Sequence, residues 1–279
     1  KSRTIPNATF ACIGTKAKMV AYRGTTGGLY KTDISNYLSI LNPRIDGVIC
    51  VAHSVEQHVK SKIAKSKHQN VVTIYKGHDY AWYQDEATDL NEVSSSTDNF
   101  NILCVGSHRP HKGTENVIKA MAHLHDLEKL RLLLVGNNLD REPFDTLIKN
   151  SPAKDKIIRT GFRNDVPQLA KAANFTLLPS TRKEGLPRTI LESLSSGTPV
   201  ITSNIDGAVE IITDGENGLV YPAEDIQALA NSIRSVYEDE TLAEKLKDNA
   251  PKVIANTFSH QVTVKNYQTY FQSLLSHQL

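Results

Sequence analysis

Short apolar runs, rich in leucine and β-branched residues, recur along this chain and alternate with segments of helical periodicity. Six such runs follow residue 98, at 102–105, 132–135, 157–158, 175–178, 200–202 and 218–221. Short continuous apolar runs separated by helices are typical of parallel strands that are buried on both faces of a sheet. Several of the runs end in Gly or another small residue, and ligands of open α/β sheets bind outside the carboxyl ends of the strands. The pattern predicts an α/β fold.

The front of the chain carries fewer units of the same kind. Three apolar runs lie at 18–22, 48–51 and 71–74, and a polar, Ser-rich stretch at 85–98 resembles a linker. A length of 279 residues suggests two domains. We therefore expect a first lobe with its linker over residues 1–98 and a second lobe over 99–260. Three strands are few for a complete lobe and the chain begins at Lys1 without Met, so we expect the first lobe to be incomplete at its N-terminus.

The tail has a different pattern. Helical periodicity runs through 223–237, 241–256 and 261–275 with no strand between these segments. The last of them, within residues 261–279, is suited to pack back across the first lobe, with Tyr267, Tyr270, Phe271 and Leu274 in the packing.

Bulk composition excludes several classes of protein. The 32 basic and 30 acidic residues leave a net charge of +2, without the basic excess of a nucleic-acid binder. No apolar run approaches the ~20 residues that span a bilayer, and no signal peptide is visible. Cys12, Cys50 and Cys104 are widely spaced and lack metal-ligand spacing, which favours buried thiols in a reducing cytoplasm.

The most informative segment runs from Ser180 to Ser203. A strand ends near Pro179, a Gly-containing turn follows, and Pro187 suits the first position of a helix that ends near Ser195. The free amides around Gly185 form an anion site, and a carboxylate there suits sugar hydroxyls better than phosphate. Two readings stay open on these residues alone: a nucleotide-sugar site, or a Glu184 that favours the helix N-terminus and a Glu192 that is merely solvated.

This segment resembles the Glu-x7-Glu signature of retaining GT-B glycosyltransferases of family 4. The sequence Glu-Gly-Leu-Pro-Arg-Thr-Ile-Leu-Glu at 184–192 is followed by Ser-Gly-Thr-Pro-Val-Ile at 196–201. Further matches precede it at 161–169 and follow it at 207–220. The resemblance covers the chain from about residue 100 and, more weakly, 17–80. It implies a GT-B fold with two Rossmann-like lobes that have parallel sheets, the second of which binds the donor.

The resemblance also implies roles for residues of the second lobe. Glu184 would contact the donor sugar and Glu192 the ribose hydroxyls. The remaining donor-side residues are those that would hold the diphosphate near the helix start or lie near the nucleobase: Gly185, Leu186, Pro187, Phe162 and Arg163.

The family places a Gly-Arg-x-x-x-x-Lys-Gly segment after the first strand of this lobe, and the chain has Gly106-Ser107-His-Arg109-Pro-His-Lys112-Gly. Lys112 matches the diphosphate-binding lysine and would neutralise the leaving group. Ser107 departs from the family's arginine, and Arg109 either supplies the second cation or is a surface charge. Because these cations would replace a metal ion, we expect no metal or other cofactor.

In the first lobe, which binds the acceptor in this family, Arg23 and Gly24 occupy the place where His-Gly is common. They would lie near the acceptor or the donor sugar, or form an ordinary turn. Residues 58–68 form a basic helical run that is either a solvated face or a platform for an anionic membrane.

The sequence thus predicts a metal-independent retaining glycosyltransferase that moves a hexose-type sugar from a nucleoside diphosphate to a glycan or lipid-linked acceptor. Cell-envelope polysaccharide or lipopolysaccharide synthesis is the expected setting, in the cytoplasm or on the inner face of the membrane. The alternatives are a nucleotide-sugar epimerase of GT-B fold and a non-catalytic nucleotide-sugar-binding module.

Overall fold

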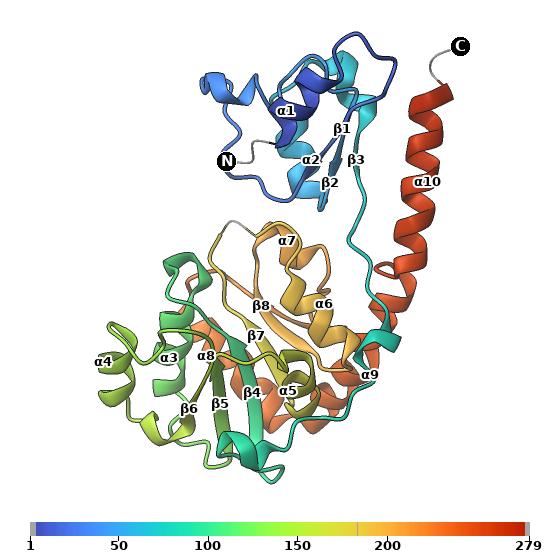
Figure 1. Cartoon of the computed structure of the whole chain (residues 1–279). Helices are drawn as coiled ribbons and strands as arrows, with labels where there is room; N and C mark the ends of the chain where they lie inside the picture. The colour runs from blue at the N-terminus through green and yellow to red at the C-terminus, as the bar shows by residue number, and fades with distance from the viewer. Residues whose placement is uncertain (1–3, 183, 277–279) are drawn as a thin grey trace. The chain divides into compact units, whose positions relative to one another are not determined.

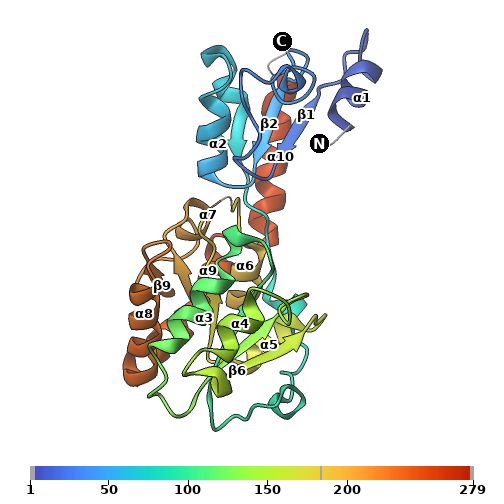
Figure 2. The same ribbon diagram turned by 90° about the vertical axis from the view of Figure 1, so that its left-hand side faces the viewer.

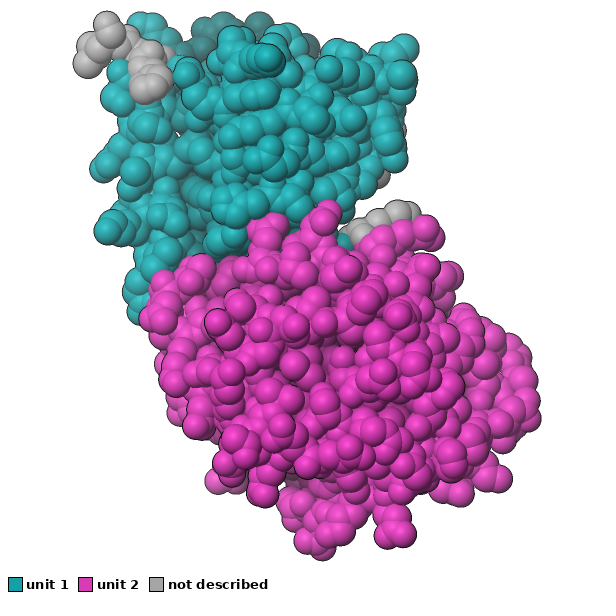
Figure 3. Space-filling model, turned by 180° about the vertical axis from the view of Figure 1, so that it is seen from behind, with its two compact units in different colours: residues 1–77, 183–186, 260–279 teal, residues 78–182, 187–259 magenta. Residues whose placement is uncertain are grey.

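The computed structural model describes residues 4–182 and 184–276, and the chain divides into two compact units. Unit 1 comprises Lys1–Gly77, Lys183–Leu186 and His260–Leu279, and unit 2 comprises His78–Arg182 and Pro187–Ser259 (Figure 3). Each unit contains one parallel sheet with helices, so the predicted α/β class is confirmed.

Unit 2 is built on a six-stranded sheet in which every neighbouring pair is parallel. Its strands are β4 (Phe100–Val105), β5 (Leu130–Val135), β6 (Ile157–Gly161), β7 (Phe175–Leu178), β8 (Val200–Ser203) and β9 (Gly218–Tyr221) (Figure 1). All six predicted apolar runs are strands. The order β6-β5-β4-β7-β8-β9 means that the chain winds outward from β4 in one direction and then from β7 in the other. The carboxyl ends of β4 and β7 therefore lie at the switch point where ligands of such sheets bind.

Helices follow most of these strands. They are α3 (Thr114–Ala122), α4 (Phe144–Lys149), α5 (Val166–Ala172), α6 (Arg188–Ser195), α7 (Asp206–Val209), α8 (Ile226–Glu238) and α9 (Glu240–Asn256). Short 3-10 helices are η3 (Tyr80–Tyr83), η4 (Leu90–Val93), η5 (Pro110–Lys112) and η6 (Lys154–Lys156). No described helix is both long and apolar enough to cross a membrane.

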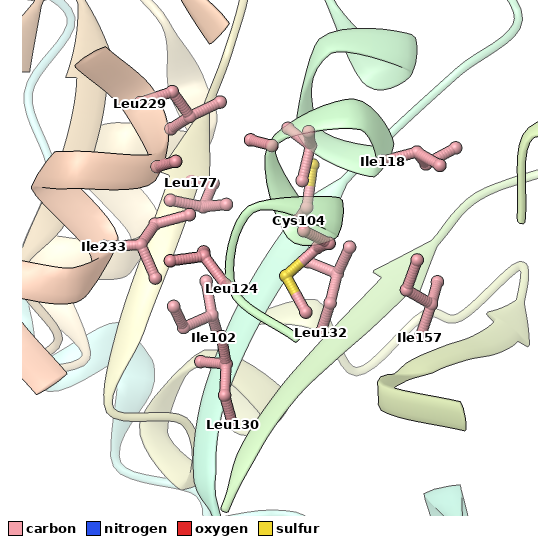
Figure 4. Packing of buried hydrophobic residues seen from close by; sticks show 14 of the residues in the cluster. Ile102, Cys104, Ile118, Leu124, Leu130, Leu132, Ile157, Leu177, Leu229 and Ile233 are labelled. Atoms are coloured by element: carbon pink, nitrogen blue, oxygen red, sulfur yellow. The ribbon is translucent and has the colours of Figure 1, made fainter. Parts of the chain in front are cut away.

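The alternation of side chains along the strands divides the core of unit 2 into two layers. On β4, Ile102 and Cys104 face the cluster that includes residues of α3, α4 and α8, and Figure 4 shows part of this packing. Leu103, between them in sequence, faces the opposite cluster with Leu169 of α5. Because both faces are covered, the central strands are predominantly apolar, which is the pattern visible in the sequence.

Unit 1 contains a three-stranded parallel sheet in the order β1-β2-β3. Its elements are α1 (Thr4–Ala11), β1 (Val20–Arg23), η1 (Ile34–Asn36), β2 (Gly47–Cys50), α2 (His53–Lys60), η2 (Lys65–Asn70), β3 (Val71–Thr73) and α10 (His260–Ser276). The three predicted runs of the front part are these strands.

The same alternation decides which helix covers which face of this sheet. Val48 and Cys50 of β2 pack in a cluster with Val55 of α2, whereas Ile49 packs with Leu274 of α10. Figure 2 shows α2 and α10 on opposite sides of the sheet. The last helix therefore contributes to the core of unit 1.

Two expectations about packing are wrong in detail. Phe271 is 43 % exposed and does not belong to the core, although Tyr270 and Leu274 of the same helix do. The basic run 58–68 is not one helix, because α2 ends at Lys60 and η2 begins at Lys65. Two lysines of this run have partners within unit 1: Lys60 donates to Glu56 Oε1 at 2.5 Å and Lys67 donates to the Pro43 carbonyl at 2.8 Å.

The segment expected to be a linker is an ordered part of unit 2. Leu90 and Val93 of η4 are buried against Leu103 and Leu169. The boundary between the units lies at Gly77, before this segment, whereas the sequence places it after residue 98. A Ser-rich composition did not reveal the two apolar side chains that hold the segment in place.

Candidate functional site

Glycines at the ends of three adjacent strands form the carboxyl edge of the sheet in unit 2. The Gly106 N–H donates to the Val135 carbonyl at 2.8 Å, and the Gly136 N–H donates to the Gly161 carbonyl at 2.9 Å. A Cβ on Gly136 would lie 2.4 Å from the Gly106 carbonyl oxygen. The absence of side chains therefore lets the backbones that follow β4, β5 and β6 run directly beside one another.

A cavity of about 390 Å³ opens at this edge. It is lined by Gly136, Asn137, Asn138, Leu139, Asp140, Arg159, Gly161 and Phe162. Phe162, expected near the nucleobase, is among them and is 65 % exposed, so its ring is available for stacking. The residues 136–140 were not among the predicted site residues. The sequence could have indicated this stretch, because Gly136 directly follows β5 just as Gly106 directly follows β4.

The loop between β4 and α3 carries the predicted cations. Ser107 anchors it: its N–H donates to Thr114 Oγ1 at 3.2 Å, and Thr114 Oγ1 donates to the Ser107 carbonyl at 3.0 Å. Lys112 is half-buried and Arg109 is exposed. Burial raises the pKa of the Cys104 thiol beneath the loop to about 12, and the nearby Lys112 charge acts in the opposite direction. Both bonds with Thr114 use the backbone of residue 107, whereas its Oγ accepts from the Arg109 N–H at 3.3 Å.

Tight backbone contact fixes this loop to the segment that follows β7. Gly113 has a φ of +67°, and a Cβ there would lie 1.9 Å from the Pro179 carbonyl oxygen. The Thr181 N–H donates to the His111 carbonyl at 2.8 Å. Lys112, between these two contacts, therefore has a defined position beside the segment Pro179–Thr181 that follows β7, at the switch point of the sheet.

Helix α6 presents Glu192, and the carboxylate is paired. Arg188 Nε donates to Glu192 Oε1 at 2.6 Å, and only 14 % of the Glu192 side chain is exposed. Burial raises the pKa of the Tyr83 hydroxyl to about 12, and the Glu192 charge adds to this shift while Arg188 opposes it. The Glu192 carboxylate is thus largely shielded from solvent and paired with Arg188 on the same helix. Pro187 is the N-cap of α6, one position before the helix begins.

Buried hydroxyls fix α6 to the sheet. Ser193 Oγ donates to the Thr198 carbonyl at 2.9 Å and lies 2.8 Å from Thr176 Oγ1 on β7. Both side chains are almost fully buried. This network sets the position of α6, and hence of Glu192, relative to the strand.

Arg163 binds within its own loop. Its Nη2 lies 2.5 Å from Asp165 Oδ2 and 3.7 Å from Glu92. The hydrogen bonds with Arg163 hold the pKa of Asp165 below its usual range, against the effect of burial and with help from Thr88. The guanidinium therefore braces the loop after β6, while the neighbouring Phe162 lines the cavity.

The remaining predicted residues lie in unit 1. Arg23 Nε donates to the Thr25 carbonyl at 2.8 Å and Nη2 donates to the Gly27 carbonyl, so this side chain closes the Gly-rich turn that follows β1. A Cβ on Gly185 would lie 2.2 Å from the Gly24 carbonyl oxygen, and Leu186 packs against the α2-side core. The structure thus brings Gly24 and Gly185 together, although they are 161 positions apart in the numbering.

Glu184 is half-buried and belongs to unit 1, as do Gly24 and Gly185. The described part of the chain contains no group of three His, Cys, Asp or Glu side chains arranged to hold a metal ion.

Comparisons with known proteins identify a family and several relatives. The model of "Glycosyl transferases group 1" matches residues 85–253. The chain is 24 % identical over 268 residues to the N-acetyl-alpha-D-glucosaminyl L-malate synthase of Bacillus anthracis, covering 94 % of this chain and 70 % of that protein. It is also 24 % identical to the capsular polysaccharide biosynthesis glycosyltransferase CapM of Staphylococcus aureus, covering 82 % of this chain and 62 % of that protein. The chain therefore spans 62–70 % of the length of these two curated relatives.

A solved structure shows the same fold. The crystal structure of Anabaena Alr3699/HepE in complex with UDP superposes with a TM-score of 0.85 at 21 % identity, covering 98 % of this chain and 76 % of that chain. The GT-B architecture expected from the sequence is confirmed. The strand order, the Glu-x7-Glu segment and the family match lead to the same conclusion: the chain belongs to the glycosyl transferases group 1 family.

Proposed function

We propose that this protein transfers a hexose-type sugar from a nucleoside diphosphate to a glycan or lipid-linked acceptor, with retention of anomeric configuration. The observation that supports it best is the half-buried Lys112, which tight backbone contacts hold beside the segment that follows β7, at the carboxyl edge of the sheet. A fixed ammonium group at a strand switch point is suited to a diphosphate.

Charge separation in the reaction assigns the roles. When the bond between the sugar and the diphosphate breaks, the phosphates gain negative charge and the sugar gains positive character. In this proposal Lys112 and Arg109 stabilise the departing diphosphate, together with backbone amides of Gly185 and Leu186. These groups do the work of a metal ion, so the proposed reaction is metal-independent.

The carboxylates would bind hydroxyl groups. Glu192 accepts from the ribose hydroxyls when the donor displaces part of its pairing with Arg188, and Glu184 orients the donor sugar. Phe162 stacks on the base in the cavity of about 390 Å³. The solved Anabaena neighbour also has a structure in complex with UDP-glucose, which supports a uridine donor as the first to test.

The proposal for the acceptor is based on residues of unit 1 and on the names of the relatives. Arg23 and Gly24 at the end of β1 are proposed to contact the acceptor or the donor sugar. The name of the Staphylococcus aureus relative supports envelope polysaccharide synthesis as the setting. A soluble cytoplasmic location, with peripheral contact of the basic run 58–68 with an anionic membrane, completes the proposal; Lys65 in this run is exposed.

Calorimetric titration with UDP, GDP and ADP tests the donor site. Lys112→Ala should weaken binding of the preferred nucleotide about 10- to 100-fold, because a charge-assisted contact contributes about 1.5–3 kcal/mol. Glu192→Gln should weaken it about tenfold through loss of the ribose contact. The matched control is Lys119→Ala on α3, whose ammonium lies 3.6 Å from Glu115 and outside the proposed site.

Unchanged affinity in both site variants would show that the donor binds elsewhere. Binding that depends on Lys112 but is never followed by sugar release or transfer would instead identify a nucleotide-sugar-binding module.

A further inference from the structure

The only tryptophan of the chain lies at an aromatic corner of unit 2 that the proposed donor site does not use. Trp82, on η3, is 58 % exposed. Its neighbour Tyr83 stacks on the buried ring of His78, with centroids 6.0 Å apart and an interplanar angle of 18°. The Tyr83 hydroxyl lies 2.8 Å from His78 Nδ1. The indole of Trp82 also contacts the His78 ring, with centroids 6.0 Å apart, so His78 supports both aromatic side chains while more than half of the Trp82 side chain stays exposed.

A shallow cavity of about 130 Å³ adjoins the indole. It is lined by Trp82, Tyr83, Asp85, Asn164, Pro167, Gln168 and Lys171. Gln168 Nε2 donates to Asp85 Oδ2 at 2.8 Å, and Lys171 Nζ donates to the Asp85 carbonyl at 3.1 Å. These bonds join the chain after η3 to α5, so the cavity is preformed.

The lining has the chemistry of a sugar subsite. An exposed indole face carries negative charge density that attracts the weakly positive C–H groups on the face of a pyranose ring. The amide of Asn164 and the carboxylate of Asp85 are planar groups that bind neighbouring hydroxyls. One carboxylate and one ammonium, on Asp85 and Lys171, balance each other, which favours a neutral ligand over a phosphate. The volume is below the roughly 300 Å³ of ordinary ligand pockets, which suits one unit of an extended chain.

We infer that this surface is a binding subsite for one residue of a neutral oligosaccharide, with the sugar ring on Trp82 and its hydroxyls on Asn164 and Asp85. It is formed by η3, Asp85, α5 and Asn164 of the loop between β6 and α5, and none of the residues that line it is among the proposed donor-binding residues. The inference concerns binding of a glycan chain and does not depend on transfer activity.

The emission of Trp82 is a direct reporter of this subsite because the chain has no other tryptophan. The full chain is titrated with maltohexaose, cellohexaose, mannohexaose and chitohexaose. At least one should shift or quench the emission saturably, and UDP should leave the oligosaccharide titration unchanged. Absence of any saturable change with all four oligosaccharides would overturn the inference.

Variants separate the subsite from general surface binding. Asn164→Ala should raise the oligosaccharide Kd at least fivefold by the same readout, and Trp82→Ala should raise it at least tenfold by calorimetry. Tyr80→Ala is the matched control, because Tyr80 lies on the same turn and is 52 % exposed but does not line the cavity. Equal effects of the Tyr80 and Trp82 variants would contradict a specific subsite.

Lys112→Ala distinguishes this inference from the proposed function. The variant should lose nucleotide affinity and keep oligosaccharide affinity. Loss of both would mean that the two ligands share one site.

Discussion

Single glycines decide how closely the loops at the carboxyl edge pack. Gly113 combines a left-handed backbone with direct contact on the Pro179 carbonyl, and Gly197 has a similar φ of +81° with open space around it. Substitutions at these two positions can therefore distinguish the free-energy cost of a left-handed backbone from the cost of steric overlap.

Alanine substitutions at these two positions should differ in urea unfolding. Gly197→Ala should cost about 1 kcal/mol, the price of a left-handed non-glycine residue. Gly113→Ala should cost about 2–4 kcal/mol, because overpacking adds about 1–3 kcal/mol to the same conformational term. Gly113→Ala should also weaken nucleotide binding, since Lys112 precedes it. Equal destabilisation by the two variants would mean that the contact with Pro179 relaxes without cost.

Residue types and spacing predicted where Lys112 and Glu192 stand in the fold but not how charged side chains pair. Arg163 was expected near the nucleobase and Arg23 near the acceptor or donor sugar or in an ordinary turn, and the sequence did not indicate that each binds a carboxylate or carbonyl group within five positions of itself. Such pairing depends on loop conformation and rotamers, which no periodicity encodes. The ion pair of Arg188 with Glu192 has the i,i+4 spacing of a helix and was accessible from the sequence.

At the scale of elements, α5 and the segment before β4 stabilise each other. Thr88 Oγ1 donates to Asp165 Oδ2 at 2.9 Å, and Leu90 and Val93 pack against Leu169. Asp165 thus connects its own loop, through Arg163, with a segment 77 positions earlier.

Replacing Asp165 by Asn removes the titratable carboxyl group, so the contribution of this side chain to stability should no longer depend on pH. The pKa of Asp165 is lowered from 3.8, first by its hydrogen bonds with Arg163. Its contribution to stability is therefore fully present above pH 3.8 and is lost as pH falls through the lower folded-state pKa. We expect Asp165→Asn to cost about 1 kcal/mol at pH 7, allowing for solvent screening. Urea titrations over a pH series measure this, with the exposed Asp248→Asn as control. A stability difference that persists unchanged at the acid end would contradict the assignment.

The nine strands of the described residues were predictable because each contains a short apolar run, and in β2, β7 and β8 every residue is buried. The 3-10 helices η3 and η4 were not, because only a few of their residues are buried and no periodicity results. The break in the basic run was missed for a related reason: charge marks a surface without defining the secondary structure beneath it.

At the scale of the whole molecule, each unit has cores of its own. In unit 1, Leu274 of α10 is 6 % exposed and packs with Ile49 and Ile74. In unit 2, the clusters on the two faces of the six-stranded sheet consist of residues of that unit.

Leu274→Ala should therefore affect one unit. We expect a cost of about 2–4 kcal/mol in unit 1, as for other buried leucines, with less than a twofold change in nucleotide affinity. Calorimetric unfolding with and without UDP, combined with titration of the variant, measures both quantities. The exposed Leu275→Ala on the same helix is the control. A matching loss of nucleotide affinity would show that the donor site depends on α10.

The contribution of α10 to the first sheet bears on the order in which the protein matures during synthesis. Every residue of unit 2 has left the ribosome once position 259 has emerged, but Ile49 and Ile74 then still lack Tyr270 and Leu274, which follow later in the chain. The unit that is translated first is thus the last to be completed. Until α10 has emerged, Ile49 and Ile74 lack the side chains that cover them in the folded unit, and unfinished apolar surface of this kind favours aggregation.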